Sequence, residues 1–372
     1  MAETSGATAL PEGTDPLQLL GQILALGVRL NASDIHLRSR NHPILRVDGM
    51  LRSVREVPPL TPDFMEALAQ VMMSDRHKEA FVHDRQVDLS IGFKDIGRVR
   101  ANIYYQRGSV AMVLRVINTS VPTPKELKLP EVVIKLIEHE RGLVLITGAT
   151  GAGKSTTLAS LINEVNHAKG KHIITIEDPI EFLFSEKKSI ITQREIGVDT
   201  MNFADAMKAA MREDPDVILL GEMRDPETIE AALAASETGH LVLSTVHSPT
   251  AADTITRIVT AFPAEGQSSV RAKVAQNLLG VVSQRLLPRK SGKGRIVACE
   301  VLTVSALARE MILEPLKVKE LDDLIKKGTL AEGMLSFDSC LHDLVKKGEI
   351  EADIALQYAS STTDLKLKLE GY

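Results

Sequence analysis

The 372-residue sequence predicts an α/β protein with a predominantly parallel sheet in its C-terminal part and a smaller α+β domain before it. Two observations support this fold class. In the C-terminal part, short apolar runs alternate with helical stretches, which is typical of parallel strands buried on both faces. These runs are Leu143–Thr147, His172–Ile176, Val217–Leu220 and Leu241–Thr245. In the N-terminal part, residues 87–117 instead predict a strand meander, because apolar and polar residues alternate.

The domain boundary is predicted at the polar connector Ser120–Lys128, which Pro122 and Pro124 stiffen. We expect a disordered tail over residues 1–16, an N-terminal domain over 17–118, a linker over 119–128, and a C-terminal domain with a helical region at its end over 129–372.

Composition excludes several classes of protein. A net charge of −5 gives no global attraction to nucleic acid, and no basic stripe is visible, so we expect no nucleic-acid partner. No apolar run is long enough to span a bilayer, and the first 15 residues do not form a secretory signal. The two cysteines, Cys299 and Cys340, are too few for a four-ligand zinc site. We expect both to be buried as small apolar residues in a protein of the reducing cytoplasm.

The N-terminal domain begins with a predicted helix, since Asp15 can cap it and Pro16 suits its first turn. The next predicted elements are a strand over 33–37, two strand halves within 43–54 joined by a turn at Asp48-Gly49, and a helical stretch over 61–81.

In the middle strand of the meander, Arg98, Arg100 and Asn102 share one face, opposite apolar residues. Two arginines on a polar face are usually solvated, but they are also the side chains that a neighbouring anion site would need. Both interpretations stay open on this pattern alone.

The C-terminal domain begins with a phosphate-binding motif. Its octet Gly148-Ala149-Thr150-Gly151-Ala152-Gly153-Lys154-Ser155 follows an apolar run and precedes a helical pattern. Glycines allow successive backbone N–H groups to surround a polyphosphate, and the helix start points its positive end at the same anion. Lys154 would contact the β- and γ-phosphates, and the Ser155 hydroxyl would hold Mg²⁺. With Thr156 added, this stretch predicts a site for ATP.

Polar side chains follow three of the predicted parallel strands, where active groups of open sheets gather. Glu222 could orient and deprotonate a water for attack on the γ-phosphate. Gly221 stands where an aspartate for Mg²⁺ is usual, so Glu177 and Asp178 become candidates for the water shell of the metal. His247 is a candidate for a γ-phosphate contact, although a histidine there is also often structural.

Helix boundaries in this domain carry clear signals. Asp225-Pro226 predicts a helix start and Gly239 its end. Two charged helices near the C-terminus are predicted to end at Lys326-Lys327-Gly328 and Lys346-Lys347-Gly348, with cations in the last turn.

Taken together, these motifs resemble those of the type II/IV secretion ATPase superfamily. Four stretches resemble its Walker A, Asp, Walker B and His boxes in order: Gly148–Ser155, Ile174–Glu181, Asp214–Glu222 and Thr238–His247. Ala32–Leu37 and Arg46–Gly49 look like the start of its N-terminal domain. Within the superfamily the sequence is most similar to the type IV pilus retraction (twitching motility) ATPases, the PilT/PilU group.

The resemblance implies a homohexameric ring in which each subunit joins a PAS-like N-terminal domain to a RecA-like ATPase domain. ATP hydrolysis between the two domains would power pilus retraction from the cytoplasmic face of the inner membrane, docked on a pilus platform protein. The family supplies arginines from the N-terminal domain to the phosphates, and the matching positions are Arg100 and Arg115. Glu222, Glu177 and His247 would complete the catalytic set, with Ser155, Glu177 and Glu222 holding Mg²⁺, the carboxylates through water.

Two alternatives remain. Assembly and type II secretion ATPases resemble this sequence but are longer and carry a four-cysteine metal site. The second alternative is an accessory paralogue of the retraction motor that has little ATP hydrolysis of its own. Residues Ser305–Ile312 match poorly the Ala-Ile-Arg-Asn-Leu-Ile-Arg motif of retraction ATPases.

Overall fold

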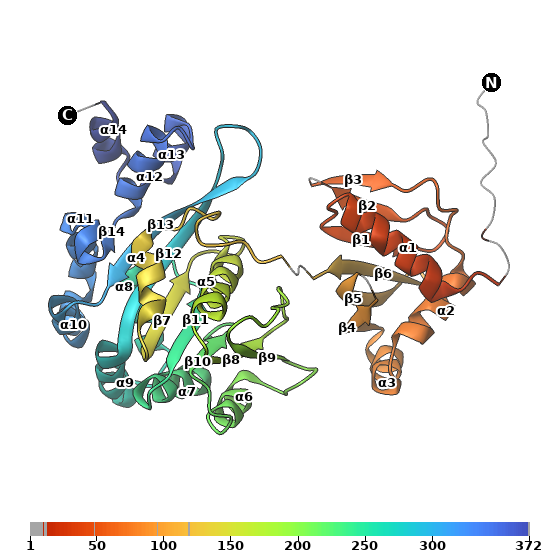
Figure 1. Ribbon diagram of the computed structural model, residues 1–372, viewed down its shortest axis with the longest axis horizontal. Coiled ribbons are helices and arrows are strands. Elements are labelled where there is room, and N and C mark those ends of the chain that lie inside the picture. The colour runs from red at the N-terminus through yellow and green to blue at the C-terminus, as the bar shows by residue number, and fades with distance from the viewer. Residues whose placement is uncertain (1–9, 11–12, 48, 95, 118–119, 371–372) are drawn as a thin grey trace. The chain divides into compact units, whose positions relative to one another are not determined.

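The computed structural model describes residue 10 and residues 13–47, 49–94, 96–117 and 120–370. The chain divides into two compact units, Met1–Thr119 and Ser120–Tyr372, and each contains one sheet (Figure 1). The predicted fold class is confirmed, with a smaller α+β unit and a larger α/β unit. Most of the predicted tail over residues 1–16 lies outside the described residues.

The first unit contains a six-stranded antiparallel sheet in the order β3-β2-β1-β6-β5-β4. Its strands are β1 (Asp34–Arg38), β2 (Ile44–Val47), β3 (Met50–Ser53), β4 (Gln86–Phe93), β5 (Gly97–Gln106) and β6 (Ser109–Val116). Its helices are α1 (Pro16–Arg29), α2 (Pro62–Met72) and α3 (Asp75–Asp84). Apolar side chains of α1 and α2, such as Leu20 and Met65, pack on the sheet and form the core of this unit.

Most local predictions for this unit are confirmed. Asp15 caps α1, because its Oδ1 accepts hydrogen bonds from the N–H groups of Leu17 and Gln18. Strands β2 and β3 pair as a hairpin; Gly49 has φ +80° in its turn, whereas Asp48 lies outside the described residues. The helical stretch predicted over about 61–81 is present but divides into two helices. Met73 is extended there, and Ser74 caps a second helix.

The second unit contains an eight-stranded sheet in the order β14-β13-β12-β7-β11-β10-β8-β9. The six strands from β12 to β9 are parallel neighbours, whereas β13 and β14 are antiparallel. The strands are β7 (Gly142–Thr147), β8 (His172–Glu177), β9 (Ile190–Glu195), β10 (Val217–Leu220), β11 (Leu241–Val246), β12 (Leu278–Pro288), β13 (Arg295–Thr303) and β14 (Met334–Leu335). The four predicted strands are all present, and sequence reasoning missed the others.

Helices cover both faces of this sheet (Figure 1). They are α4 (Glu131–Lys135), α5 (Lys154–Ala168), α6 (Phe203–Ala210), α7 (Pro226–Glu237), α8 (Ala251–Thr260), α9 (Ala264–Asn277), α10 (Ala306–Leu313), α11 (Leu321–Lys327), α12 (Phe337–Lys346), α13 (Ala352–Tyr358) and α14 (Thr362–Glu370). Three 3₁₀ turns lie at Leu136–Glu138, Pro315–Glu320 and Leu330–Glu332. Helix α5 packs on one face and α6 to α9 pack on the other, so the parallel strands are buried on both sides, as predicted.

The predicted helix boundaries in this unit are also confirmed. Asp225 caps α7, since its Oδ1 accepts the N–H of Thr228 at 2.9 Å, and Gly239 follows with φ +110°. Helices α11 and α12 end in lysines followed by Gly328 and Gly348. Only Gly348 is left-handed, with φ +69°. At Gly328 the reason for glycine is space, because a Cβ would lie 2.6 Å from the Met334 side chain.

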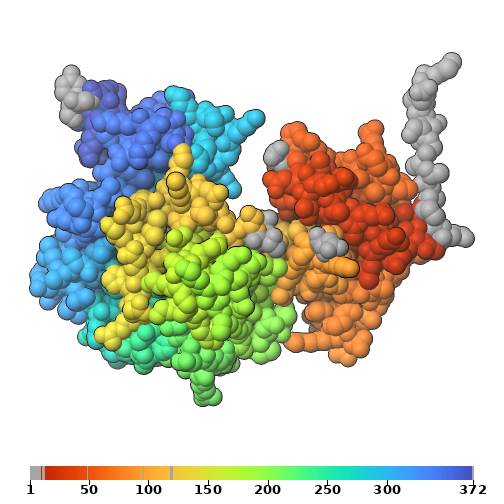
Figure 2. Space-filling model, viewed as in Figure 1, coloured from red at the N-terminus to blue at the C-terminus, as the bar shows by residue number. Residues whose placement is uncertain are grey.

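The C-terminal helices α12 to α14 lie against β12 and β13. The Arg285 guanidinium stacks on the Phe337 ring, 3.8 Å from its centroid, and donates to the carbonyl of Tyr358. In Figure 2 the blue surface of these helices adjoins the cyan surface of the two strands. Cys299 and Cys340 are both free and buried, which confirms their expected apolar role, and burial raises the pKa of Cys340 to about 11.

Candidate active site

The phosphate-binding motif forms the turn between β7 and α5. Gly151 and Gly153 have φ +79° and +88°, values that side chains with a Cβ rarely adopt. Gly153 is the N-cap of α5 and provides no side-chain acceptor, so the first N–H groups of the helix stay open to an anion. At Gly148 a Cβ would lie 2.6 Å from the carbonyl oxygen of Gln284, so β12 approaches too closely for any other residue.

Lys154 is buried at the start of α5, with 8% of its surface exposed. Its ammonium donates to the carbonyl oxygens of Gly148 at 2.9 Å and Ala149 at 3.0 Å. Burial lowers the pKa of Lys154, while the carboxylates of Glu222 and Glu181 oppose that shift. The loop therefore holds a cation at its centre and open N–H groups at its rim, which together suit a polyphosphate.

Glu177 ends β8 beside this loop. Its Oε1 accepts hydrogen bonds from Thr175 Oγ1 at 2.7 Å and from Gln193 Nε2 at 3.3 Å. Burial raises the pKa of Glu177, and those two hydrogen bonds counteract part of the rise. Gln193 belongs to β9, a strand that the sequence analysis missed, so its contact with Glu177 was also missed.

Glu222 follows the end of β10, and its side chain is only 13% exposed. The preceding residue is fixed on both sides, since the Gly221 N–H donates to Ile176 O at 2.8 Å and Thr245 Oγ1 donates to Gly221 O at 2.7 Å. A Cβ at Gly221 would lie 3.2 Å from Ile176 O and 3.5 Å from Glu177 Cα. The β8 backbone therefore lies close enough that a side chain at this position would require it to shift by a few tenths of an ångström.

Two basic side chains lie next to the Glu222 carboxylate. His247 Nε2 lies 3.7 Å from its Oε2, and Arg224 forms an ion pair with its Oε1. Burial and the Lys154 cation lower the pKa of His247, while the Glu222 carboxylate opposes that shift. Sequence analysis did not identify Arg224, although its position two residues after Glu222 was a possible signal.

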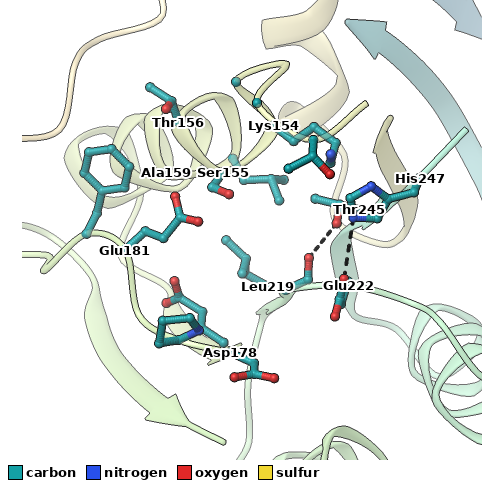
Figure 3. Close-up of a pocket in the computed structure, with 18 of the residues that line it drawn as sticks. Lys154, Ser155, Thr156, Ala159, Asp178, Glu181, Leu219, Glu222, Thr245 and His247 are labelled. Carbon is teal, nitrogen blue, oxygen red and sulfur yellow. Dashed lines mark hydrogen bonds and ion pairs between the residues drawn. The ribbon is translucent and has the colours of Figure 1, made fainter. Parts of the chain in front are cut away.

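These groups meet around one cavity of about 380 Å³ at the carboxyl ends of β8, β10 and β11 (Figure 3). Of the predicted site residues, those that line it are Thr150, Gly151, Gly153, Lys154, Ser155, Thr156, Glu177, Asp178, Glu222 and His247. Glu181, Phe182, Phe184, Leu158 and Arg295 also line it and were not predicted. Gly148, Ala149 and Ala152 are absent from the lining, because Gly148 lies against β12 and Ala152 is buried in the turn.

The predicted arginines belong to the first unit and have acidic neighbours there. Arg100 and Arg115 pair across β5 and β6, an arrangement in which like charges repel. Two carboxylates offset this repulsion. Arg115 Nη2 lies 2.6 Å from Asp34, and Arg100 Nη2 lies 3.9 Å from Asp88. Whether either arginine acts on a nucleotide stays a prediction.

The donor set around the cavity is compatible with Mg²⁺. The described residues contain no cluster of three or more side chains suited to holding a metal ion on their own. Magnesium usually keeps several waters and takes one or two carboxylates together with substrate phosphates. Ser155, Glu177 and Glu222 on the cavity wall offer that smaller set.

Comparisons with known proteins agree with this geometry. Residues 13–337 match the family described as "Type II/IV secretion system protein". The chain is 42% identical to the "Type IV pilus retractation ATPase PilT" of Pseudomonas aeruginosa, covering 91% of this chain and 97% of that protein. It is 40% identical to the "Type IV pilus ATPase PilU" of the same organism, covering 94% and 91%.

Solved structures extend the comparison to the fold. The crystal structure of the pilus retraction motor PilT with bound ADP superposes with a TM-score of 0.86 at 45% identity, covering 93% of this chain and 98% of that one. The ATPase DotB of Legionella pneumophila gives 0.81 at 27% identity, covering 94% and 97%. The chain therefore belongs to the type II/IV secretion system protein family and is a PilT-like member of it.

Proposed function

We propose that this chain is an ATP-hydrolysing motor subunit that forms a homohexameric ring and powers type IV pilus retraction. One observation carries the enzymatic part of the proposal: Glu222 and the phosphate-binding turn before α5 face the same cavity. Similarity to the ADP-bound retraction motor PilT supports both the nucleotide and the process.

The chain's own residues have distinct roles in this proposal. The open N–H groups at the start of α5 and the Lys154 ammonium bind the phosphates, and Lys154 exchanges its two carbonyl acceptors for phosphate oxygens. The Ser155 hydroxyl would hold Mg²⁺, and the carboxylates of Glu177 and Glu222 would hold it through water. When bound, Mg²⁺ neutralises part of the phosphate charge.

Hydrolysis then needs a positioned water. Glu222 accepts a proton from that water as its oxygen bonds to the γ-phosphorus, and the bond from phosphorus to the bridging oxygen breaks to leave ADP and phosphate. His247 contacts the γ-phosphate from its position beside Glu222. Arg100 and Arg115 from the N-terminal domain stabilise the charge that develops on the transferred group.

We further propose partners and a location for this ring. The ring is placed in the cytoplasm, docked at the inner-membrane base of the pilus machine on its platform protein, in company with a paralogous retraction ATPase. None of the described helices is long and apolar enough to cross a membrane.

The test of the enzymatic proposal is Glu222→Gln. This variant keeps the size of the side chain but removes the base, so we expect ATP affinity within about threefold of the wild type and turnover reduced by about 10²-fold or more. Nucleotide binding is measured with a fluorescent ATP analogue and turnover by phosphate release. Wild-type turnover in this variant would refute the assignment of Glu222 as the base.

A second candidate is an accessory paralogue, because the identity to PilU is nearly the same as that to PilT. Phosphate release by the purified protein alone separates the two, since a modulatory paralogue would show almost none. Deletion of the gene tests the process. Excess surface pili without twitching support retraction, whereas loss of pili would indicate an assembly ATPase.

A further inference from the structure

Glu300 is a buried carboxylate that does not line the nucleotide cavity. It lies on β13, and 7% of its surface is exposed. Its Oε1 accepts a hydrogen bond of 3.0 Å from the N–H of Ala251, the first residue of α8. Among the described residues no cation lies within ion-pair distance of Glu300. The positive end of α8 therefore faces the Glu300 carboxyl group.

This contact completes the capping of α8. The N-cap Thr250 accepts only the N–H of Asp253, at 3.1 Å, through its own hydroxyl. The N–H of Ala251 has no acceptor within the helix, because the first four donors of an α-helix are unpaired. Glu300 supplies that acceptor from a strand about fifty residues further along the chain. Because this acceptor belongs to β13, it fixes the position of the α8 N-terminus relative to that strand.

The start of α8 is tied to the segment that carries His247. Only residues 247–250 separate β11 from α8. Within this stretch Ser248 Oγ and Thr254 Oγ1 share a buried hydrogen bond of 2.7 Å, and Thr254 Oγ1 also donates to Thr250 O at 2.6 Å. A displacement of the first turn of α8 is therefore transmitted to His247, whose ring lies 3.7 Å from Glu222.

Glu300 is also connected to the phosphate-binding turn, through neighbouring residues on adjacent strands. Glu300 and Ser283 are partners across the β12–β13 ladder, so their side chains are neighbours on the same face of the sheet. Thr147 Oγ1 donates to Ser283 Oγ at 3.0 Å, and Thr147 directly precedes Gly148. Thr147 and Ser283 are fully buried.

We propose that Glu300 is a positioning residue for the ATPase reaction. It fixes the His247 segment relative to the phosphate-binding turn. The connection runs through neighbouring buried residues, from Thr147 through Ser283 and Glu300 to the N-terminus of α8. This inference rests on the proposed function, because it assigns Glu300 its effect through His247. Glu300 itself lies outside the lining of the nucleotide cavity.

The first experiment compares Glu300→Ala and Glu300→Gln in the full-length protein. Misplacement of a catalytic group by about 1 Å can cost about 10²-fold in rate, so we expect kcat of Glu300→Ala to fall by about 10- to 100-fold, with KM and nucleotide affinity nearly unchanged. Glu300→Gln keeps an acceptor oxygen for Ala251 and should recover most of kcat. A folded Glu300→Ala with kcat within twofold of the wild type would overturn the proposal.

A matched control is Asp338→Ala. Asp338 is equally buried and also caps a following segment, accepting the N–H groups of Ser360 and Ser361 at 2.7 and 3.0 Å, but it lies outside the cavity lining. We expect it to lower stability without lowering kcat. Equal losses of kcat in both alanine variants would reduce Glu300 to a purely structural role and overturn the proposal.

A double-mutant cycle with His247→Ala identifies the route of the effect. If Glu300 acts through His247, adding Glu300→Ala to His247→Ala changes kcat less than twofold, whereas independent effects would multiply. Should Glu300→Ala fail to fold, Thr254→Val cuts the same connection at its other end and should give the same loss of kcat, again absent in the His247→Ala background. Absence of ATPase activity in the wild type would instead refute the proposed function.

Discussion

Replacing Gly148 and Gly151 in turn compares a steric clash in the phosphate-binding turn with backbone strain alone. A Cβ at Gly148 would lie 2.6 Å from Gln284 O at φ +141°, whereas at Gly151, with φ +79°, it would meet no atom within 4 Å. Gly148→Ala should displace the turn from β12 and lose most nucleotide affinity. Gly151→Ala carries only backbone strain of about 1–3 kcal/mol and should retain measurable binding. Nucleotide titration and thermal unfolding of both variants check this, and the opposite ranking would contradict it.

Glu300 gives a pH dependence of stability with a definite sign. Burial raises its pKa from 4.5 to about 7, with the Asp322 charge adding to the rise and the Ala251 hydrogen bond and Arg285 opposing it. The folded carboxyl holds its proton where the unfolded one has lost it, so its contribution to stability is complete below pH 4.5 and is lost as the pH rises through about 7. Between those limits the wild type should lose about 3 kcal/mol more unfolding free energy than Glu300→Gln. Denaturant titrations at several pH values measure the difference, and parallel pH profiles would contradict it.

At the scale of elements, the C-terminal helices depend on one capping carboxylate. Asp338 on α12 accepts two backbone N–H groups directly before α14. Hydrogen bonds to a charged group contribute about 1.5–3 kcal/mol each, so Asp338→Ala should lower the unfolding free energy by about 3–6 kcal/mol in total and expose α14 to proteolysis. Asp364→Ala is the control, since this exposed acid in the first turn of α14 serves only the helix dipole and should cost less than about 1 kcal/mol. Similar losses in both variants would argue against the Asp338 cap.

For the whole molecule, the open question is whether the first unit supplies a cation to the nucleotide. Arg115 pairs with Asp34, and that contact complicates a simple deletion. Burial raises the pKa of Asp34, but the hydrogen bonds from Arg115 and Ser33 outweigh it and leave the pKa below its ordinary value. Breaking the pair therefore affects stability as well as any catalytic role.

Asp34→Asn separates the two effects because it weakens the ion pair but keeps the arginine. If Arg115 stabilises the transferred phosphate, Arg115→Ala should lower kcat by about 10³-fold, while Asp34→Asn should change it little. If the arginine serves only the sheet, both variants should lose stability alike and keep turnover. Phosphate release and thermal unfolding, both measured on the assembled protein, distinguish these outcomes.

The sequence by itself determined the features that depend on a few neighbouring residues. The glycine-rich turn before α5, the four short parallel strands and the cap of α7 at Asp225 all follow local patterns of apolarity, capping and backbone freedom. The strand ends with Glu177, Glu222 and His247 were also predictable, because parallel strands present their carboxyl ends at one edge of the sheet.

Only the tertiary structure decided which side chains surround those residues. Gln193 reaches Glu177 from β9, and Glu300 reaches Ala251 from β13, and neither strand was predicted. Such contacts depend on strand order and register between segments far apart in the chain, which no local pattern contains. Gly221 shows the same limit. The sequence shows glycine where an aspartate is usual, whereas the close approach of the β8 backbone to this position is a distance that exists only in the folded sheet.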